Sequence, residues 1–136
     1  YVDQFDDESI IELFALVDQA VADRDFEEYA SFFGPNYTAT DASDGAYIVT
    51  NRTEYLEFVE ELFDTAKSLE VRTRVMDIDY TEPGSEALVR VQEEEKREQF
   101  GNTQHYTSLV EYDVGFEDGW IFFIRSKKTD MQVIDE

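Results

Sequence analysis

The segment from Glu86 to Lys128 constrains the fold more than any other part of the chain. Apolar and polar residues alternate along three long stretches, separated by turn residues at Gly101-Asn102 and between Gly115 and Gly119. This alternation predicts three antiparallel strands joined by two hairpins. Because successive side chains of a strand point to opposite faces, pairing the strands also predicts which residues share a face.

A two-residue loop at Gly101-Asn102 would place Phe100 opposite Thr103 and so set the register of the first two strands. One predicted face is a core wall of apolar residues: Ala87, Val89, Val91, Tyr106, Val110, Tyr112, Val114, Trp120, Phe122 and Ile124. Polar residues interrupt this face: Glu93, Glu95, Ser108 and Ser126. These interruptions are where we look for function.

The opposite predicted face carries polar cross-strand pairs: Arg90 with Asp113, Gln92 with Glu111 and Glu98 with His105. It also carries an apolar group: Leu88, Leu109, Ile121 and Phe123. An exposed apolar band usually marks a partner surface. We therefore expect a two-fold homodimer formed through Leu109, Ile121 and Phe123 on the outer face of the sheet.

Before this segment, helical and extended patterns alternate. Apolar spacing predicts one helix from Asp6 to about Asp23 and a short second helix capped by Asp25 and ended by Gly34-Pro35. A short strand follows at Tyr37 to Ala42, with a turn at Ser43-Asp44-Gly45. Asn51 and Glu54 form a capping pattern for a third helix that ends near Ala66. From Leu69 to Tyr80 the alternation shifts its phase, which predicts a β-bulge.

These elements predict an α+β fold with three N-terminal helices packed on a strongly curved, mostly antiparallel sheet. The chain of 136 residues is long enough for one domain, which we place at 1–136 with a core at about 8–128. After Lys128 the sequence is polar, and we expect it to fray. The sequence has no cysteine, no signal-peptide pattern and no apolar run of membrane-spanning length, so we expect a cytoplasmic protein.

The net charge of −22 is extreme for a chain of this length. It argues against nucleic acid as a partner, because the phosphate backbone would be repelled. The acidic residues are spread along the chain, which indicates a surface property and not a binding tail. We therefore expect a halophilic protein, in which molar salt screens the repulsion; an ordinary acidic protein is the alternative.

Several short motifs recur in the order typical of one superfamily: Asp23-Arg24-Asp25-Phe26, Phe32 to Tyr37, Asp44-Gly45 and Asp118-Gly119-Trp120. From about residue 8 to 128 the chain resembles the nuclear transport factor 2-like superfamily. That superfamily includes ketosteroid isomerase, scytalone dehydratase and SnoaL-like polyketide cyclases. The resemblance implies a cone-shaped α+β domain, and it says little about function because this fold hosts many activities.

The resemblance to ketosteroid isomerase implies that Asp41, at the end of the first strand, occupies the position of the general base. The isomerase tyrosine of the first helix falls at Val17, and its neutral aspartic acid falls near Ser108. The oxyanion-binding pair is therefore missing, and steroid isomerase activity is not expected. The histidines of the dehydratases are also missing, since His105 is the only histidine.

Asp41 is the candidate catalytic residue, because a carboxylate at the mouth of an apolar cavity can act as a base. The alternative is that Asp41 begins an Asx-type turn. Our candidate ligand-binding residues are Tyr112, Ser108, Glu93, Trp120 and Tyr29. Glu93 and Glu95 either reach into a pocket, where one can pair with Arg97, or are simply solvated. Trp120 also fits a plain core role.

Three hypotheses follow. The first is a SnoaL-like domain that binds a small apolar or aromatic molecule between helices and sheet. The second is an isomerase, cyclase or dehydratase using Asp41 as base, with Tyr112 or Ser108 donating to an oxyanion. The third is a non-catalytic dimerisation module with a filled cavity. We expect no cofactor and no metal site: His105 would be a surface partner of Glu98, and the sequence lacks a phosphate loop or ligand cluster.

Overall fold

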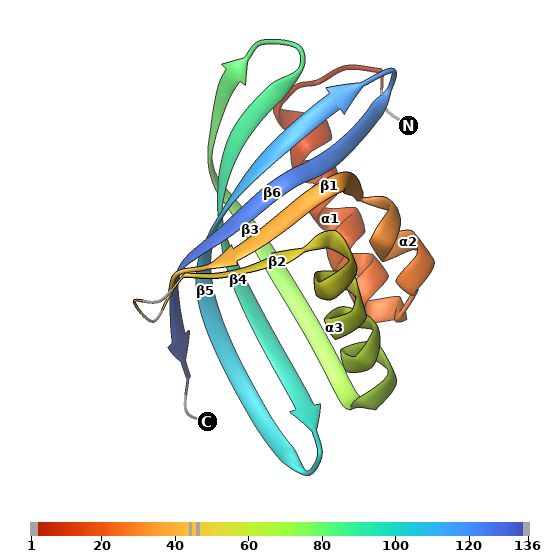
Figure 1. The fold of residues 1–136 in the computed structure, drawn as a ribbon, viewed down its shortest axis with the longest axis vertical. Helices are drawn as coiled ribbons and strands as arrows, with labels where there is room; N and C mark the ends of the chain where they lie inside the picture. The colour runs from red at the N-terminus through yellow and green to blue at the C-terminus, as the bar shows by residue number, and fades with distance from the viewer. Residues whose placement is uncertain (1–2, 44, 46, 135–136) are drawn as a thin grey trace.

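The computed structural model describes residues 3–43, 45 and 47–134 as an α+β fold. In chain order the elements are α1 (Asp7–Asp23), α2 (Phe26–Ser31), β1 (Phe33–Asp41), β2 (Ile48–Asn51), α3 (Arg52–Thr65), β3 (Ala66–Glu82), β4 (Glu86–Gln99), β5 (Asn102–Glu117) and β6 (Trp120–Val133). The sheet has the order β2-β1-β6-β5-β4-β3. Among the described strands, β1 and β6 run parallel and the other neighbours antiparallel. Figure 1 shows the helices on one side of a strongly curved sheet.

The helix starts confirm the predicted caps. The Asp6 side chain accepts a hydrogen bond from the Ser9 amide at 2.9 Å, and Asp25 caps α2. Asn51 and Glu54 form a reciprocal capping box at the start of α3. One expectation needs correction: α3 follows β1 and β2, so only α1 and α2 precede the sheet.

The strand β1 begins earlier than predicted. The chain turns into the sheet at Phe33, and α2 ends at Ser31, so Gly34-Pro35 lies inside the strand. A Cβ atom on Gly34 would lie 3.2 Å from the Phe123 carbonyl oxygen, which explains a glycine where β1 meets β6. Asp44, in the predicted turn after this strand, lies outside the described residues.

The predicted bulge in β3 is confirmed at Met76. Val75 pairs with Val91 and Asp77 pairs with Arg90, so Met76 is the extra residue. Its side chain is exposed. A bulge of this kind bends and twists a sheet, which fits the strong curvature.

The predicted register of β4 and β5 is wrong by two residues. The loop consists of Phe100-Gly101, both with positive φ, and Gln99 pairs with Asn102. Two positive φ values are what a tight hairpin turn requires, and glycine suits the second position. Arg90 therefore lies opposite Glu111, and His105 lies opposite Lys96. Because the shift is even, the predicted faces of β4 and β5 are still correct.

The predicted faces of the first half of β6 are wrong. Val114 pairs with Phe123 while Asp113 pairs with Arg125, so Ile124 is an extra, bulged residue. Before this bulge, Ile121 and Phe123 point into the core and are buried. Trp120 and Phe122 therefore lie on the outer face. There the Phe122 ring packs over Gly115, where it leaves no room for a Cβ atom.

The expected fraying after Lys128 is wrong for the described residues up to Ile134, which stay bound to the sheet. β6 continues to Val133, which pairs with Tyr106, and the Ile134 amide donates to the His105 carbonyl oxygen at 2.7 Å. A second irregularity at Thr129 keeps Lys128 and Met131 on the inner side.

The core lies between the helices and the inner face of the sheet. Ile10 and Leu13 of α1 are fully buried, as are Val89 of β4 and Phe123 of β6. Each such side chain contributes about 1.5–3 kcal/mol by burial. In Figure 1 the hairpin of β4 and β5 extends past the ends of the helices, so its inner face is less covered there. Throughout the described chain, no helix is both long and apolar enough to cross a membrane.

Candidate functional site

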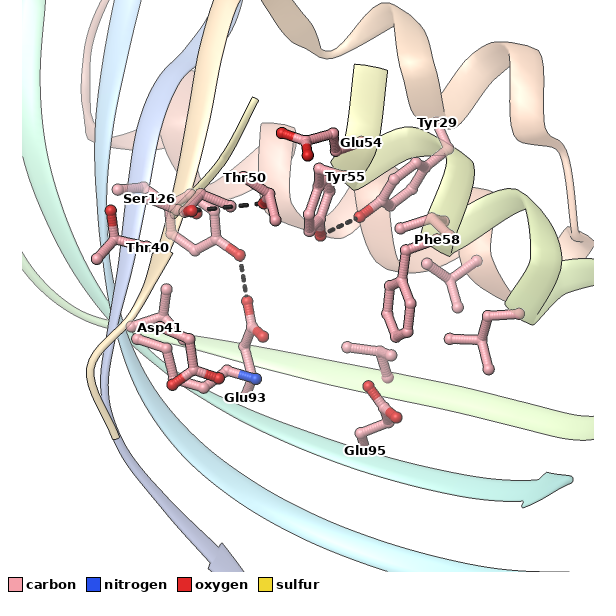
Figure 2. A pocket seen from close by; sticks show the side chains of 18 of the residues that line it. Tyr29, Thr40, Asp41, Thr50, Glu54, Tyr55, Phe58, Glu93, Glu95 and Ser126 are labelled. Carbon is pink, nitrogen blue, oxygen red and sulfur yellow. Dashed lines mark hydrogen bonds between the residues drawn. The ribbon is translucent and has the colours of Figure 1, made fainter. Parts of the chain in front are cut away.

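A cavity of about 420 Å³ lies between α3 and the inner face of the sheet. Apolar residues make up much of its wall: Val21, Ala39, Ile48, Phe58, Val59, Leu62, Phe63, Leu69, Val71 and Val110. Figure 2 shows Tyr55 and Phe58 of α3 on one side, with Glu93 and Glu95 of β4 opposite them. Phe58 is 56% exposed, and Ile48 is equally exposed, so both residues stand at the mouth of the cavity.

Glu93 lies inside this cavity next to Tyr112. The Tyr112 hydroxyl donates to Glu93 Oε1 at 2.5 Å, joining β4 to β5 across the inner face. Burial raises the pKa of Glu93 above its usual value; the Tyr112 hydrogen bond and the charge of Lys128 reduce that rise. Glu93 is therefore a carboxyl group whose charged form is disfavoured by its surroundings.

Buried tyrosines surround the same space. The hydroxyl groups of Tyr29 and Tyr55 lie 2.9 Å apart, and the Tyr37 hydroxyl lies 2.5 Å from Ser126 Oγ. Burial raises the pKa of Tyr29, Tyr37 and Tyr55 far above the ordinary value. These hydroxyls stay protonated at neutral pH, and those of Tyr29 and Tyr55, which line the cavity, can donate hydrogen bonds to a ligand.

Asp41 lies at the end of β1, where it borders the cavity, and it also forms the Asx-type turn given above as its alternative role. Its Oδ1 accepts from the Ser43 amide at 3.0 Å and from Ser43 Oγ at 2.6 Å. Burial alone would raise the pKa of Asp41, but these two hydrogen bonds and the charge of Lys128 lower it below its ordinary value. Such a carboxylate is a weak base.

Charged residues continue the site toward the β4–β5 hairpin. Arg97 Nε and Nη2 donate to Glu95 Oε2 at 2.9 and 2.5 Å, so of the two alternatives given above the structure shows the pair. A side cavity of about 190 Å³ adjoins them and shares Glu93, Glu95, Arg97 and Lys128 with the main cavity. Ser108, opposite Glu93 on β5, lines this side cavity.

The structure separates the remaining candidates. Tyr29, Tyr112 and Glu93 line the main cavity, whereas Trp120 does not: the bulge at Ile124 turns Trp120 to the outer face, where it stacks on Phe122.

His105 lies on the outer side, with Nε2 3.3 Å from Glu94 Oε1, so the predicted partner Glu98 is wrong. Among the described residues, no group of His, Asp or Glu side chains is arranged to hold a metal ion.

Sequence reasoning missed Tyr55 and Lys128 as site residues. Tyr55 belongs to the apolar stripe of α3, and a tyrosine on such a stripe gives a detectable signal, because its hydroxyl needs a partner when buried. Lys128 gives a signal as well. It lies two residues after Ser126, so the alternation that places Ser126 on the inner face also places Lys128 there.

No family model matches the sequence, and no curated protein sequence matches it either. Solved structures do match. A conserved protein from Planctomyces limnophilus has a TM-score of 0.78 at 15% identity, covering 92% of this chain and 94% of that one. A ketosteroid isomerase-like protein from Erwinia carotovora atroseptica has a TM-score of 0.70 at 15% identity, covering 97% and 100%.

An NTF-2-like protein of unknown function from Shewanella oneidensis has a TM-score of 0.66 at 16% identity. The alignment covers 90% of this chain and 98% of that one. At these identities the likeness concerns the fold. The order of helices and the six-stranded curved sheet of the described residues agree with it. The chain has the α+β fold of the nuclear transport factor 2-like superfamily.

Proposed function

We propose that this chain is a small-molecule-binding domain whose ligand occupies the cavity between α3 and the sheet. The cavity itself carries the proposal. Its volume of about 420 Å³ falls in the range of ligand pockets, which are mostly apolar with a few well-placed polar groups. Tyr29, Tyr112 and Glu93 supply such groups, and Ser108 serves the adjoining side cavity.

An enzyme of the isomerase, cyclase or dehydratase type is the second candidate, and the Glu93–Tyr112 pair favours it. A general base works best when its pKa lies near the working pH. The pKa of Glu93 is raised toward neutral pH, as a general base requires, whereas the pKa of Asp41 is lowered away from neutral pH. Asp41 remains the position that the family resemblance singles out, but Glu93 is the stronger base of the two.

A non-catalytic dimerisation module is the least supported of the three hypotheses. Such a module has no need for an internal space and would fill it with side chains, since interiors are close-packed. An unfilled cavity that tyrosines and carboxylates border argues against it.

The test is whether filling the cavity abolishes ligand binding. We expect Val71→Phe on β3 and Thr40→Phe on β1 each to weaken the binding of Nile red, a neutral apolar dye, about tenfold or more, because both residues line the cavity. Val49→Phe is the matched control, since Val49 is exposed on β2 beside the cavity but is not part of its wall. Fluorescence titration measures the affinity, and circular dichroism verifies folding. Undiminished dye binding by both cavity variants would contradict the proposal.

We also propose that the chain forms a homodimer through the outer face of β4, β5 and β6. Of the three residues expected there, Leu109 is exposed, but Ile121 and Phe123 are buried in the core. The apolar residues of that face are Leu88, Leu109, Trp120, Phe122 and Ile124, which we call the outer band. Charged pairs such as Arg125–Asp113 and Arg90–Glu111 flank it, as at the rim of an interface.

A further inference from the structure

The wall of the main cavity carries more negative than positive side chains. Its carboxylates are Asp41, Glu54, Glu93 and Glu95, and its cations are Arg97 and Lys128. A concave surface with low-dielectric walls focuses the field of its excess charge, so it attracts ligands of the opposite sign. The net charge of −22 on the whole chain acts in the same direction. The cavity thus favours a cation over an anion.

Arg97, the cation best suited to an anionic ligand, is already engaged. Both Nε and Nη2 donate to the same oxygen of Glu95. The guanidinium also lies over the Tyr106 ring, 5.6 Å from its centroid. Lys128 is the other cation, and its charge favours the ionised form of both Asp41 and Glu93. One lysine beside two carboxylates leaves a negative excess around Glu93.

Glu93 has the geometry to receive a ligand cation. In the described part of the chain, its hydrogen bonding is limited to Oε1, which accepts from Tyr112, so Oε2 can accept from a ligand. Tyr29, Tyr55 and Tyr112 line the same cavity as Glu93. Aromatic rings attract cations, so these tyrosines add to the preference of the cavity for a cation.

The α3 wall has an apolar part beyond Glu54 and Tyr55. Figure 2 shows Phe58 across the cavity from Glu93 and Glu95, and Val59 and Leu62 of the same helix line the cavity with it. An ammonium group at Glu93 would therefore leave the rest of a small molecule against α3. The cavity therefore has a carboxylate on the sheet side and apolar side chains on the α3 side.

We propose that the ligand is a small apolar amine, bound as its cation with the ammonium donating to Glu93 and the apolar part against Phe58, Val59 and Leu62. This inference rests on the proposed function, because it names the ligand class of the same cavity. It assigns to Glu93 the role of ligand anchor. An organic acid is the ligand class that it excludes.

Three compounds of nearly equal shape test the charge: phenethylamine (cation), 2-phenylethanol (neutral) and phenylacetate (anion). We expect isothermal titration calorimetry, at one salt concentration that keeps the protein folded, to give phenethylamine about tenfold tighter binding than 2-phenylethanol. A charge-assisted hydrogen bond is roughly twice as strong as a neutral one, and tenfold corresponds to about 1.4 kcal/mol. Phenylacetate should bind most weakly.

Glu93→Gln should bring the affinity for phenethylamine down to that for 2-phenylethanol and leave the alcohol unchanged. Glu94→Gln is the matched control, since it removes the same charge from the neighbouring residue on the outer face, and it should keep the preference. Equal binding of amine and alcohol by the natural protein, or a preference that survives Glu93→Gln, would overturn the amine inference alone. Failure of all three compounds to bind would overturn the amine inference, and failure of Nile red to bind as well would overturn the binding function.

Discussion

Glu93 and Asp41 are two carboxylates on one cavity whose pKa values are displaced in opposite directions. Burial dominates at Glu93, whereas at Asp41 two hydrogen bonds from Ser43 and the charge of Lys128 outweigh it. A carboxyl group that folding makes harder to ionise costs stability at neutral pH. One that folding makes easier to ionise adds stability there. Ionised Glu93 therefore lowers the stability of the fold, whereas ionised Asp41 stabilises the turn at the end of β1.

We expect Glu93→Gln to raise the free energy of unfolding at pH 8 by about 1 kcal/mol, because it removes a buried charge and keeps an acceptor for Tyr112. The folded pKa of Glu93 is raised above 4.5, so the cost of its charge is present above the folded pKa. It fades as the pH falls through that value, and so does the gain from the substitution. Urea unfolding at pH 8 and pH 4 measures both.

Asp41→Asn should act in the opposite direction and lower stability at pH 8 by about 0.5–1 kcal/mol, because it keeps an acceptor for Ser43 but removes the charge that strengthens these bonds and attracts Lys128. The folded pKa of Asp41 lies below 3.8, so its contribution is present above 3.8 and disappears as the pH falls through the folded pKa. The same urea series checks it. A pH-independent difference for either variant would contradict the assignment of that carboxyl.

At the scale of elements, sequence patterns predicted the helices well because their ends carry local signals. The caps at Asp6, Asp25 and Asn51 bond to amides within three residues, so the sequence contains the whole interaction. The faces of β4 and β5 were also predictable, since an error of two residues in register leaves every side chain on its face.

The faces of β6 were not predictable in the same way. The bulge at Ile124 comes from its pairing with β5, where Gly115 leaves room for Phe122 and Ile124. That packing joins residues of different strands, and alternation along one strand does not record it. The consequence extends to the site: Trp120 leaves the candidate ligand-binding set.

The outer band yields a prediction for the whole sheet face. Leu109 and Trp120 are 40% and 42% exposed, so a charge at either position is tolerated by the folded monomer but not by an apolar interface. We expect Leu109→Arg with Trp120→Arg to weaken dimerisation at least tenfold. Val49→Arg, at an exposed apolar residue of β2 outside the outer band, should leave it unchanged. Sedimentation equilibrium measures the dissociation constants; a natural protein that sediments as a monomer would refute the dimer.

At the scale of the whole molecule, the charge of −22 is the dominant property. Glu57 and Glu61, one turn apart on α3, are both exposed and have no Lys or Arg within four residues. Like charges at this spacing destabilise a helix. Several cationic residues are instead paired with carboxylates on the sheet, such as Arg90 with Asp77. The helical surface should therefore be the main source of repulsion in the fold.

We expect the melting temperature to rise by about 5 °C or more between 0.1 and 2 M KCl. The Debye length falls from about 10 Å to below about 3 Å over this range, which screens the repulsion. About 1 kcal/mol corresponds to roughly 4 °C for a domain of this size. Calorimetric melts in KCl measure the rise.

Neutralising four exposed helical residues (Glu12, Glu57, Glu60 and Glu61, each to Gln) should raise the melting temperature at 0.1 M KCl and flatten its dependence on salt.

The quadruple variant separates charge screening from the general effect of salt on apolar surface. Salt that merely strengthened hydrophobic burial would raise the melting temperature of both proteins in parallel, because the variant keeps the same core. Screening predicts convergence instead: the two melting curves differ at 0.1 M and meet near 2 M. A natural protein whose melting temperature is the same at both salt concentrations would show that its charge is not a halophilic adaptation.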